Sequence, residues 1–173
     1  MKNQSLNSSS SYLTFLLSNK EFAVDVEKIN NIIELTKITS VKGAPSFMRG
    51  TIAHEGNALP VVDFRHKLGM TPASYTMHTC IIIANINTMG VRTKVGLLVD
   101  AVQSVLEISS SDIQAISDRR VASFRPYITG KTNYEGQAIK LIDINKAFAK
   151  WELESMNAVE KDAHATIQMS MIN

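Results

Sequence analysis

The sequence predicts an all-β fold of two small β-barrels, and three observations lead to this prediction. A unit of the chain occurs twice, each copy holds about five short strands with tight turns, and an amphipathic helix is indicated only at the C-terminal end. The chain has 173 residues, of which 45% are hydrophobic and 20% charged, an ordinary globular composition. One copy of about 65 residues would be a marginal domain, so the two copies are expected to pack together.

The internal repeat is visible as two in-register matches. Residues 47–64 align with residues 127–144 without a gap at an offset of 80, and residues 29–35 echo residues 102–108 at an offset of 73. The difference of seven places a loop insertion within the polar stretch 109–126. The identities in the first match pair Gly50 with Gly130, Glu55 with Glu135, Gly56 with Gly136, Ala58 with Ala138 and Asp63 with Asp143.

The first copy is expected over 12–75, after a Ser- and Asn-rich, disordered segment 1–11. Apolar and β-branched residues predict strands at 12–17 and 21–26, and 28–35 is interpreted as a strand rather than a short helix. A short helix is predicted over 46–49, ended by Gly50. A hairpin then turns at Glu55-Gly56-Asn57, where the glycine supplies a positive φ.

The second copy is expected over 76–150, with strands at 79–86, 93–100 and 102–108 and a hairpin that turns at 135–137. An amphipathic helix is predicted over 144–158, followed by a frayed tail from about 159. Its apolar face would hold Ile144, Phe148, Trp151 and Met156. Exchange of strands between the two barrels is left open.

The charge and composition of the chain argue against nucleic-acid binding and against membrane insertion. The net charge is +2 with both signs interspersed, which favours no nucleic-acid partner. Arg49, Arg65 and Lys67 form the best basic patch, but aromatic residues to stack bases are scarce. The N-terminal residues lack the apolar core of a signal peptide, and no run reaches the ~18 apolar residues of a membrane span. We expect a cytoplasmic protein without membrane insertion, in which Cys80 is a small buried hydrophobe.

Motifs for catalysis are missing. The sequence holds no P-loop, G-x-G-x-x-G, HExxH or CxxC, so we expect no cofactor and no metal. A triad of His54, Asp63 and a serine is conceivable, as is a carboxylate pair of Asp63 and Asp143. Both aspartates end apolar strands, where a carboxylate commonly accepts backbone N–H groups, and this structural role is favoured. What remains is an interaction scaffold.

The segment APSFMRGTIAHEGNALPVVDFRHKLG resembles the signature of the chemotaxis coupling protein family, CheW, approximately TPxFIxGxxNLRGxxxPVxDLRxxF. Segments EFAVDVEKINNI and KVGLLVDAVQSVLEI also resemble family segments, and the similarity covers about residues 12–150. It implies two five-stranded SH3-like barrels around a shared core. The signature positions matched are Pro45, Phe47, Gly50, Gly56, Pro60, Val61, Asp63 and Arg65.

The resemblance implies a non-enzymatic adaptor between the cytoplasmic tip of a chemoreceptor and the regulatory domain of a CheA-type histidine kinase. Because proline interrupts a strand ladder, the segment around Pro60 is expected to be a barrel edge that docks on the kinase. The implied kinase contacts are Gly56, Asn57, Ala58, Leu59 and Pro60. The implied receptor contacts are Ile29, Asn30, Ile32, Gly50, Glu55 and Cys80.

Two departures from the family pattern bear on the partner. Glu55 stands where the family usually has arginine, and Asn31 where it often has glutamate. A receptor in membrane-associated arrays stays the leading partner, but the two departures put the standard receptor and its usual array in doubt. They make an alternative chemosensory pathway, or a partner other than a receptor, plausible. One alternative is a module that modulates the kinase without binding receptors, and another is a small enzyme with an unrecognised site.

Overall fold

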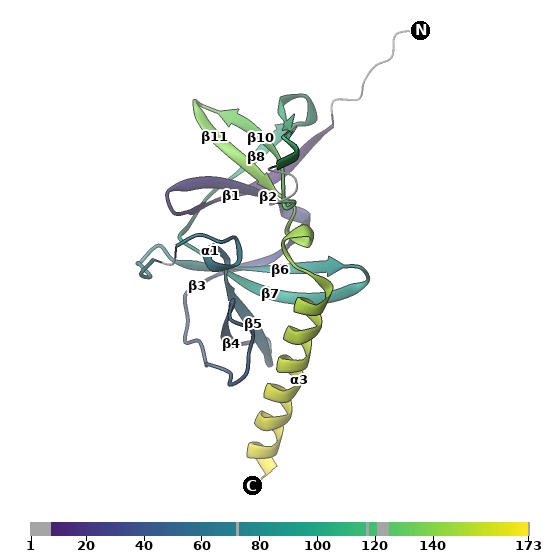
Figure 1. Ribbon diagram of the computed structural model, residues 1–173. Coiled ribbons are helices and arrows are strands. Elements are labelled where there is room, and N and C mark those ends of the chain that lie inside the picture. Colours follow the sequence, from purple (N-terminus) through teal and green to yellow (C-terminus); the bar gives the residue numbers. More distant parts are fainter. Residues whose placement is uncertain (1–7, 72, 117, 121–124, 173) are drawn as a thin grey trace.

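The computed structural model describes residues 8–71, 73–116, 118–120 and 125–172. The chain forms two β-sheets, one above the other in Figure 1, and the long helix α3 (Lys150–Ile172) runs beside the lower sheet. Each sheet is an SH3-like β-barrel, so the predicted all-β fold of two such barrels with short helices and a C-terminal helix is confirmed.

Barrel 1, the lower one in Figure 1, has five strands in the order β3-β6-β7-β5-β4. Neighbouring strands are antiparallel except for β5 and β7, which run parallel. A short helix, α1 (Phe64–Lys67), follows the last residue of β5. The strands are β3 (Ile29–Glu34), β4 (Met48–His54), β5 (Asn57–Asp63), β6 (Cys80–Thr88) and β7 (Val91–Val99).

Barrel 2 has the same plan, in the order β8-β1-β2-β11-β10-β9, with β2 and β11 parallel. Its sixth strand, β9, has only two residues. Single 3-10 turns lie at η1 (Val26–Lys28), η2 (Ser110–Asp112) and η3 (Ile144–Ala147). The strands are β1 (Ser9–Leu17), β2 (Lys20–Asp25), β8 (Ala101–Ser109), β9 (Gln114–Ala115), β10 (Ile128–Tyr134) and β11 (Gln137–Ile142).

The two repeat copies exchange their first hairpins. Barrel 1 takes β3, β4 and β5 from the first copy but β6 and β7 from the second, and barrel 2 takes β1 and β2 from the first copy. The expected division of the chain into barrels at 12–75 and 76–150 is therefore wrong. Barrel 1 is continuous over 29–99, whereas barrel 2 joins 9–25 to the region after residue 100.

The duplication itself is confirmed strand by strand. His54 pairs with Asn57 and Tyr134 with Gln137, and both ladders shift register after Met48 and Ile128, positions that are 80 apart. Each hairpin turn has two residues of positive φ, 49° and 77° at Glu55-Gly56 and 48° and 80° at Glu135-Gly136. Positive φ at both central residues is the signature of a type I′ turn, which matches the twist of the flanking strands.

The helix predicted over 46–49 does not form. Ser46 and Phe47 lie in a turn closed by the Met48 N–H on the Pro45 carbonyl (2.9 Å), and β4 begins at Met48. Gly50 is inside that strand with a φ of 145°, and the preceding chain crosses it there. A Cβ atom at Gly50 would lie 2.1 Å from the Thr39 carbonyl oxygen, so the glycine permits this close approach.

Three apolar clusters hold the fold together. The largest lies between the barrels and includes Phe15, Phe22, Val62, Phe64 and Leu97. A second fills barrel 1 around Ile52, Val61 and Ile81, and a third fills barrel 2 around Ala23, Ile139 and Leu141. The largest cluster draws on both repeat copies, which agrees with barrels that share a core.

Helix α3 packs on barrel 1, against β5 and β7. Leu153 and Met156 are fully buried, and Lys67 lies 3.2 Å from Glu152 and over the rings of Phe47 and Phe148. Ile144, Phe148 and Met156 are buried as predicted, but Trp151 is 61% exposed. The predicted bounds also fail, because residues 144–147 form a 3-10 turn and the α-helix continues from Lys150 to Ile172.

The N-terminal strand starts earlier than expected. β1 begins at Ser9, so the serines at 9–11, predicted to be disordered, pair with β8. The pairing reaches Ser109, where β8 ends, and Ser9 and Ser10 are exposed to water. The rest of the disorder prediction, residues 1–7, lies outside the described residues. In the described part of the chain, no helix is long and apolar enough to cross a membrane.

Candidate protein interaction surfaces

A buried ion network joins the two barrels where β5 ends. The Arg65 side chain is 2% exposed and lies 3.2 Å from Asp63 Oδ2 and 3.0 Å from Asp100 Oδ1. The Asp100 contact is an ion pair that falls short of hydrogen-bond geometry at Nη1. Asp100 in turn accepts the Ser18 N–H (2.7 Å) from the turn of the first hairpin. Arg65 therefore links barrel 1 to the exchanged hairpin of barrel 2.

Asp63 is a structural carboxylate, as the sequence predicted. It accepts the N–H groups of Arg65 and His66 at the start of α1, and it also accepts hydrogen bonds from the side chains of Arg65 and Arg49. Burial alone would raise the pKa of Asp63, but the hydrogen bonds and charge of Arg65, helped by Arg49 and the His66 N–H, hold that pKa below its usual value. Asp143 accepts the Asn145 N–H in the same way.

The predicted kinase edge is not an edge of the sheet. β5 lies between β4 and β7, and Ala58, Leu59 and Pro60 are buried. Thr51 of β4 lies opposite Pro60, but its N–H and C=O bind Thr39 on the far side of β4. Thr51 and Pro60 are therefore a pair without hydrogen bonds between them, and the backbone nitrogen of Pro60 points away from β4. On that side β5 pairs with β7 only from Val61 onward.

At Pro60, β5 has no strand paired on the side away from β4, as the proline predicted, but helix α3 packs on β5 instead. The exposed remainder of the predicted kinase site is Gly56 and Asn57 at the hairpin tip. Beside them lies a cavity of about 290 Å³, between the start of β5 and helix α3. It is lined by Asn57, Ala58, Asn157, Glu160 and Lys161.

The true edge of barrel 1 carries part of the predicted receptor site. β3 pairs only with β6, and its residues Asn30 and Ile32 are exposed, the latter to 40%. Ile32 pairs with Ile82 and Glu34 with Cys80, so Ile32 and Cys80 share the face that turns toward the shared core. Ile29 is half-buried and packs against that core. The structure thus brings Ile29, Ile32 and Cys80 onto neighbouring strands.

Gly50 and Glu55 lie elsewhere. Both belong to β4 and its hairpin, at the other edge of the sheet from β3, and Gly50 is buried under Thr39. Glu55 is exposed at the turn, 3.8 Å from His54 Nε2. A partner can therefore contact Glu55 but not the buried Gly50.

A residue that was not predicted stands out at the edge of barrel 2. Val105 on β8 is 59% exposed, and it lies 73 positions after Ile32, which is the offset of the second sequence match. Among the described strands, β8 pairs only with β1, as β3 pairs only with β6. The repeat could have identified Val105, because an exposed aliphatic residue in one copy predicts one in the other.

The catalytic alternatives gain no support. Asp63 has its oxygens engaged by Arg65 and Arg49, and among the described residues no three His, Cys, Asp or Glu side chains converge on a metal site. Burial raises the pKa of the Cys80 thiol, and this effect outweighs the hydrogen bond with the Val102 backbone, which lowers that pKa. Arg49, Arg65 and Lys67, the suggested basic patch, have acidic partners within the protein.

Two barrels with exposed edge strands form the kind of surface that other proteins bind, and the fold is that of a protein-interaction module. The CheW-like domain model matches residues 11–152. The chemotaxis protein CheW of Rhizobium meliloti (strain 1021) is 34% identical over 143 residues, 83% of this chain and 90% of the relative. The CheW of Klebsiella aerogenes is 29% identical over 150 residues, 87% and 88% of the two chains.

A solved structure shows the same fold. The scaffolding protein TtCheW from Thermoanaerobacter tengcongensis matches with a TM-score of 0.70 and 22% identity, over 84% of this chain and 96% of the other. The chain belongs to the CheW-like family of chemotaxis scaffold proteins.

Proposed function

We propose that this chain couples the cytoplasmic tip of a chemoreceptor to the regulatory domain of a CheA-type histidine kinase, as a cytoplasmic adaptor recruited to membrane-associated receptor arrays. Membership of the CheW-like family supports this role. The observation that supports it is that barrel 1 exposes two separate regions, edge strand β3 and the β4–β5 hairpin tip. An adaptor needs surfaces that two partners occupy at once.

For the receptor we propose the β3 edge, with Ile29, Asn30, Ile32 and Cys80. Ile32 offers exposed aliphatic surface on the face that turns toward the shared core, and its neighbour Asn31 binds the Ile32 N–H with its own side chain (2.8 Å). A helical hairpin that buries such aliphatic side chains gains about 25 cal/mol per Å² of apolar area. Glu55 on the other edge is proposed as a charged rim contact.

For the kinase we propose the hairpin tip, Gly56 and Asn57, together with the adjoining surface of α3. The cavity beside Asn57 receives a side chain of the partner in this arrangement. Ala58, Leu59 and Pro60 are buried, so their proposed role is to hold the hairpin tip in position rather than to contact the kinase.

A second function is favoured by the two departures from the family pattern. Glu55 and Asn31 replace the usual arginine and glutamate. A kinase-modulating module that does not bind receptors would tolerate both changes.

Co-purification separates the two functions. We expect affinity-tagged full-length chain to recover kinase and chemoreceptor together from the native cytoplasm and membranes. Recovery of kinase alone would support the modulating module instead. Recovery of neither would exclude both.

Asn57→Arg should weaken binding of the kinase regulatory domain about tenfold, equivalent to ~1.4 kcal/mol, because a long charged side chain replaces a short one at the proposed contact. Isothermal titration calorimetry with the isolated regulatory domain measures this. Gln137→Arg, at the equivalent position of barrel 2, is the matched control and should keep wild-type affinity. Equal affinities for all three proteins would move the kinase contact away from the hairpin tip.

Glu55→Arg should weaken binding to the native receptor tip several-fold at low salt, and the loss should shrink at high salt because ions screen a rim charge. Thermal melting should not change, since exposed charges rarely shift stability by more than about 0.5 kcal/mol. Glu135→Arg changes the equivalent turn of barrel 2 and should bind like wild type. An unaltered receptor affinity for Glu55→Arg at low salt would make Glu55 a neutral position.

A further inference from the structure

Helix α3 fills an opening in barrel 1. Strands β5 and β7 pair only from Val61 and Gly96 onward, and α3 packs over the part where they separate. Asn157 of α3 accepts a hydrogen bond from Thr93 Oγ1 (3.0 Å) and donates one to the Arg92 carbonyl (3.3 Å), both on β7. Under this helix Ala58 is only 4% exposed.

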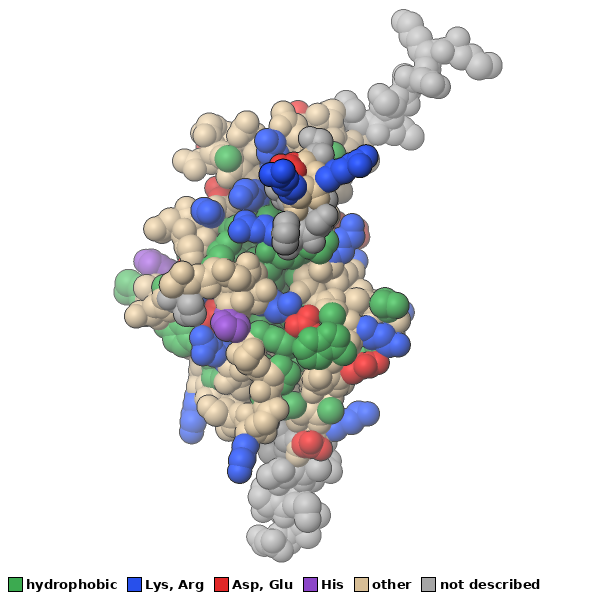
Figure 2. All heavy atoms as spheres, in the orientation of Figure 1, with side chains coloured by type: hydrophobic (Ala, Val, Ile, Leu, Met, Phe, Trp, Pro, Cys, Tyr) green, Lys and Arg blue, Asp and Glu red, His purple; other side chains and the backbone are tan. Residues whose placement is uncertain are grey.

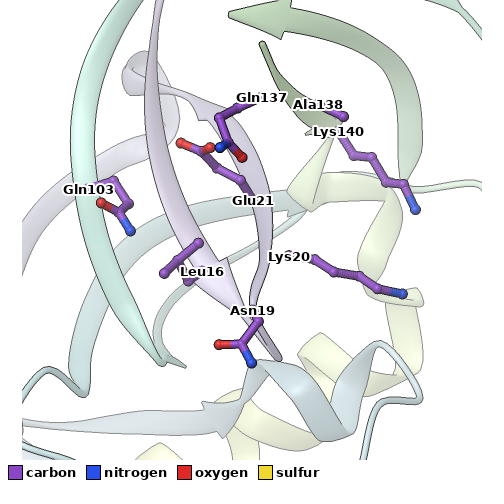
Figure 3. A pocket seen from close by; sticks show the side chains of 8 residues that line it. All are labelled: Leu16, Asn19, Lys20, Glu21, Gln103, Gln137, Ala138 and Lys140. Atoms are coloured by element: carbon purple, nitrogen blue, oxygen red, sulfur yellow. The ribbon is translucent and has the colours of Figure 1, made fainter. Parts of the chain in front are cut away.

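Among the described residues, no helix packs over the equivalent opening of barrel 2 as α3 does over barrel 1. Strands β11 and β2 pair from Ile139 and Glu21 onward, so Gln137 and Ala138 of β11 and Lys20 of β2 lie ahead of the paired part. Ala138, which matches Ala58 in the repeat, is exposed. A cavity of about 640 Å³ lies here, and all its lining residues belong to β1, β2, β8, β11 and the first hairpin turn (Figure 3). They are Leu16, Asn19, Lys20, Glu21, Gln103, Gln137, Ala138 and Lys140.

The rim of this opening is positively charged. The side chains of Lys20 and Lys140 extend to one side of the sheet, whereas Glu21 and Gln137 lie on the other (Figure 3). Burial and the charges of Lys20 and Arg125 lower the pKa of Lys140, so Lys20 and Arg125 each repel Lys140. Among the ion pairs of the described residues, none involves them. Figure 2 shows Lys and Arg gathered over the upper barrel, with fewer Asp and Glu among them.

We propose that this opening is a docking site for an acidic helical segment of a partner protein. The internal repeat indicates a helix, because α3 occupies the equivalent opening of barrel 1, and the rim lysines select acidic side chains by charge complementarity. β11 and β2 pair two residues earlier in the repeat than β5 and β7, so the site takes a short helical segment. The site rests on the proposed adaptor function and adds a third docking surface to it.

A peptide of residues 150–162, KWELESMNAVEKD, is the probe, since this segment already fits the equivalent opening and carries four carboxylates against two lysines. A lactam staple keeps so short a helix folded. Titrated into the isotope-labelled full chain, it should shift the amide signals of Lys20, Gln137 and Ala138. Lys140→Glu should weaken this binding at least about tenfold, ~1.4 kcal/mol, whereas Lys42→Glu, an exposed lysine of barrel 1, should not.

Three results would overturn the proposal. Shifts confined to Asn57 and Thr93 would mean that the peptide only exchanges with α3 on barrel 1. Wild-type affinity for Lys140→Glu would exclude the lysine rim, and equal binding of an unstapled, scrambled peptide of the same composition would show a response to charge alone. The titration contains only this chain and the peptide, so a negative result leaves kinase and receptor binding to their own measurements.

Discussion

Arg65→Met will destabilise the protein by about 3–5 kcal/mol, because it leaves the buried carboxylate of Asp63 without its main partner and Asp100 without its link to barrel 1. Methionine keeps most of the apolar stem, so the loss comes from charge and hydrogen bonds rather than volume. Urea denaturation at pH 7 measures the change. Arg49→Ala is the matched control, since Arg49 also pairs with Asp63 but is 41% exposed, and it should cost less than about 1 kcal/mol.

The pH dependence distinguishes the ion network from simple packing. In the wild type the pKa of Asp63 is lowered, so this carboxylate contributes stability above its unfolded pKa of about 3.9, and that contribution is lost as the pH falls through the folded value. In Arg65→Met the hydrogen bonds and charge of Arg65 are gone, so burial is expected to raise the pKa of Asp63. The difference in stability between the two proteins should therefore begin to shrink above about pH 4, as Asp63 of the variant takes up a proton. It should shrink further below about pH 4, as the wild-type carboxylate is protonated. A difference that stays constant with pH would show that packing is responsible.

Gly50→Ala will destabilise the protein by about 3–5 kcal/mol, which combines backbone strain with a steric clash. The strain arises from the φ of 145°, and the clash is with the Thr39 carbonyl, a backbone atom that cannot move aside cheaply. Thermal or urea unfolding measures the loss, and receptor binding will fall only to the extent that folding does.

Gly56→Ala provides the control for Gly50→Ala. Gly56 also has a positive φ, 77°, but a Cβ there would meet nothing within 4 Å. Its substitution should cost about 1–2 kcal/mol from conformation alone. Equal losses for the two variants would refute the close approach of Thr39 as the reason for Gly50.

Local chemistry explains what the sequence could predict. The Glu-Gly turns, their positive φ and the strands on either side depend on a few neighbouring residues, and the offset of 80 predicted that both hairpins share one register. The structural role of Asp63 was predictable for the same reason, because its carboxylate accepts the nearby N–H groups of Arg65 and His66.

Pairing between distant strands was not predictable in this way. Exchange of the first hairpins leaves every local pattern unchanged, so sequence periodicity cannot reveal it. The predicted kinase edge was wrong for the same reason. Pro60 correctly indicated a missing hydrogen bond between strands, but only the tertiary structure shows that α3 packs on β5 there. Trp151 likewise follows the helical spacing, yet the helix turns it toward water.

The exchanged hairpins also set the order in which the molecule can form on the ribosome. Barrel 1 uses residues 29–99 and can close once these have emerged, although α3 has yet to be made. The hairpin of β1 and β2 is synthesised first, but its parallel partner β11 pairs Ile139 with Glu21, 118 positions later. Until then one flank of β2 has no strand beside it. The earliest part of the nascent chain is thus among the last to be protected from aggregation.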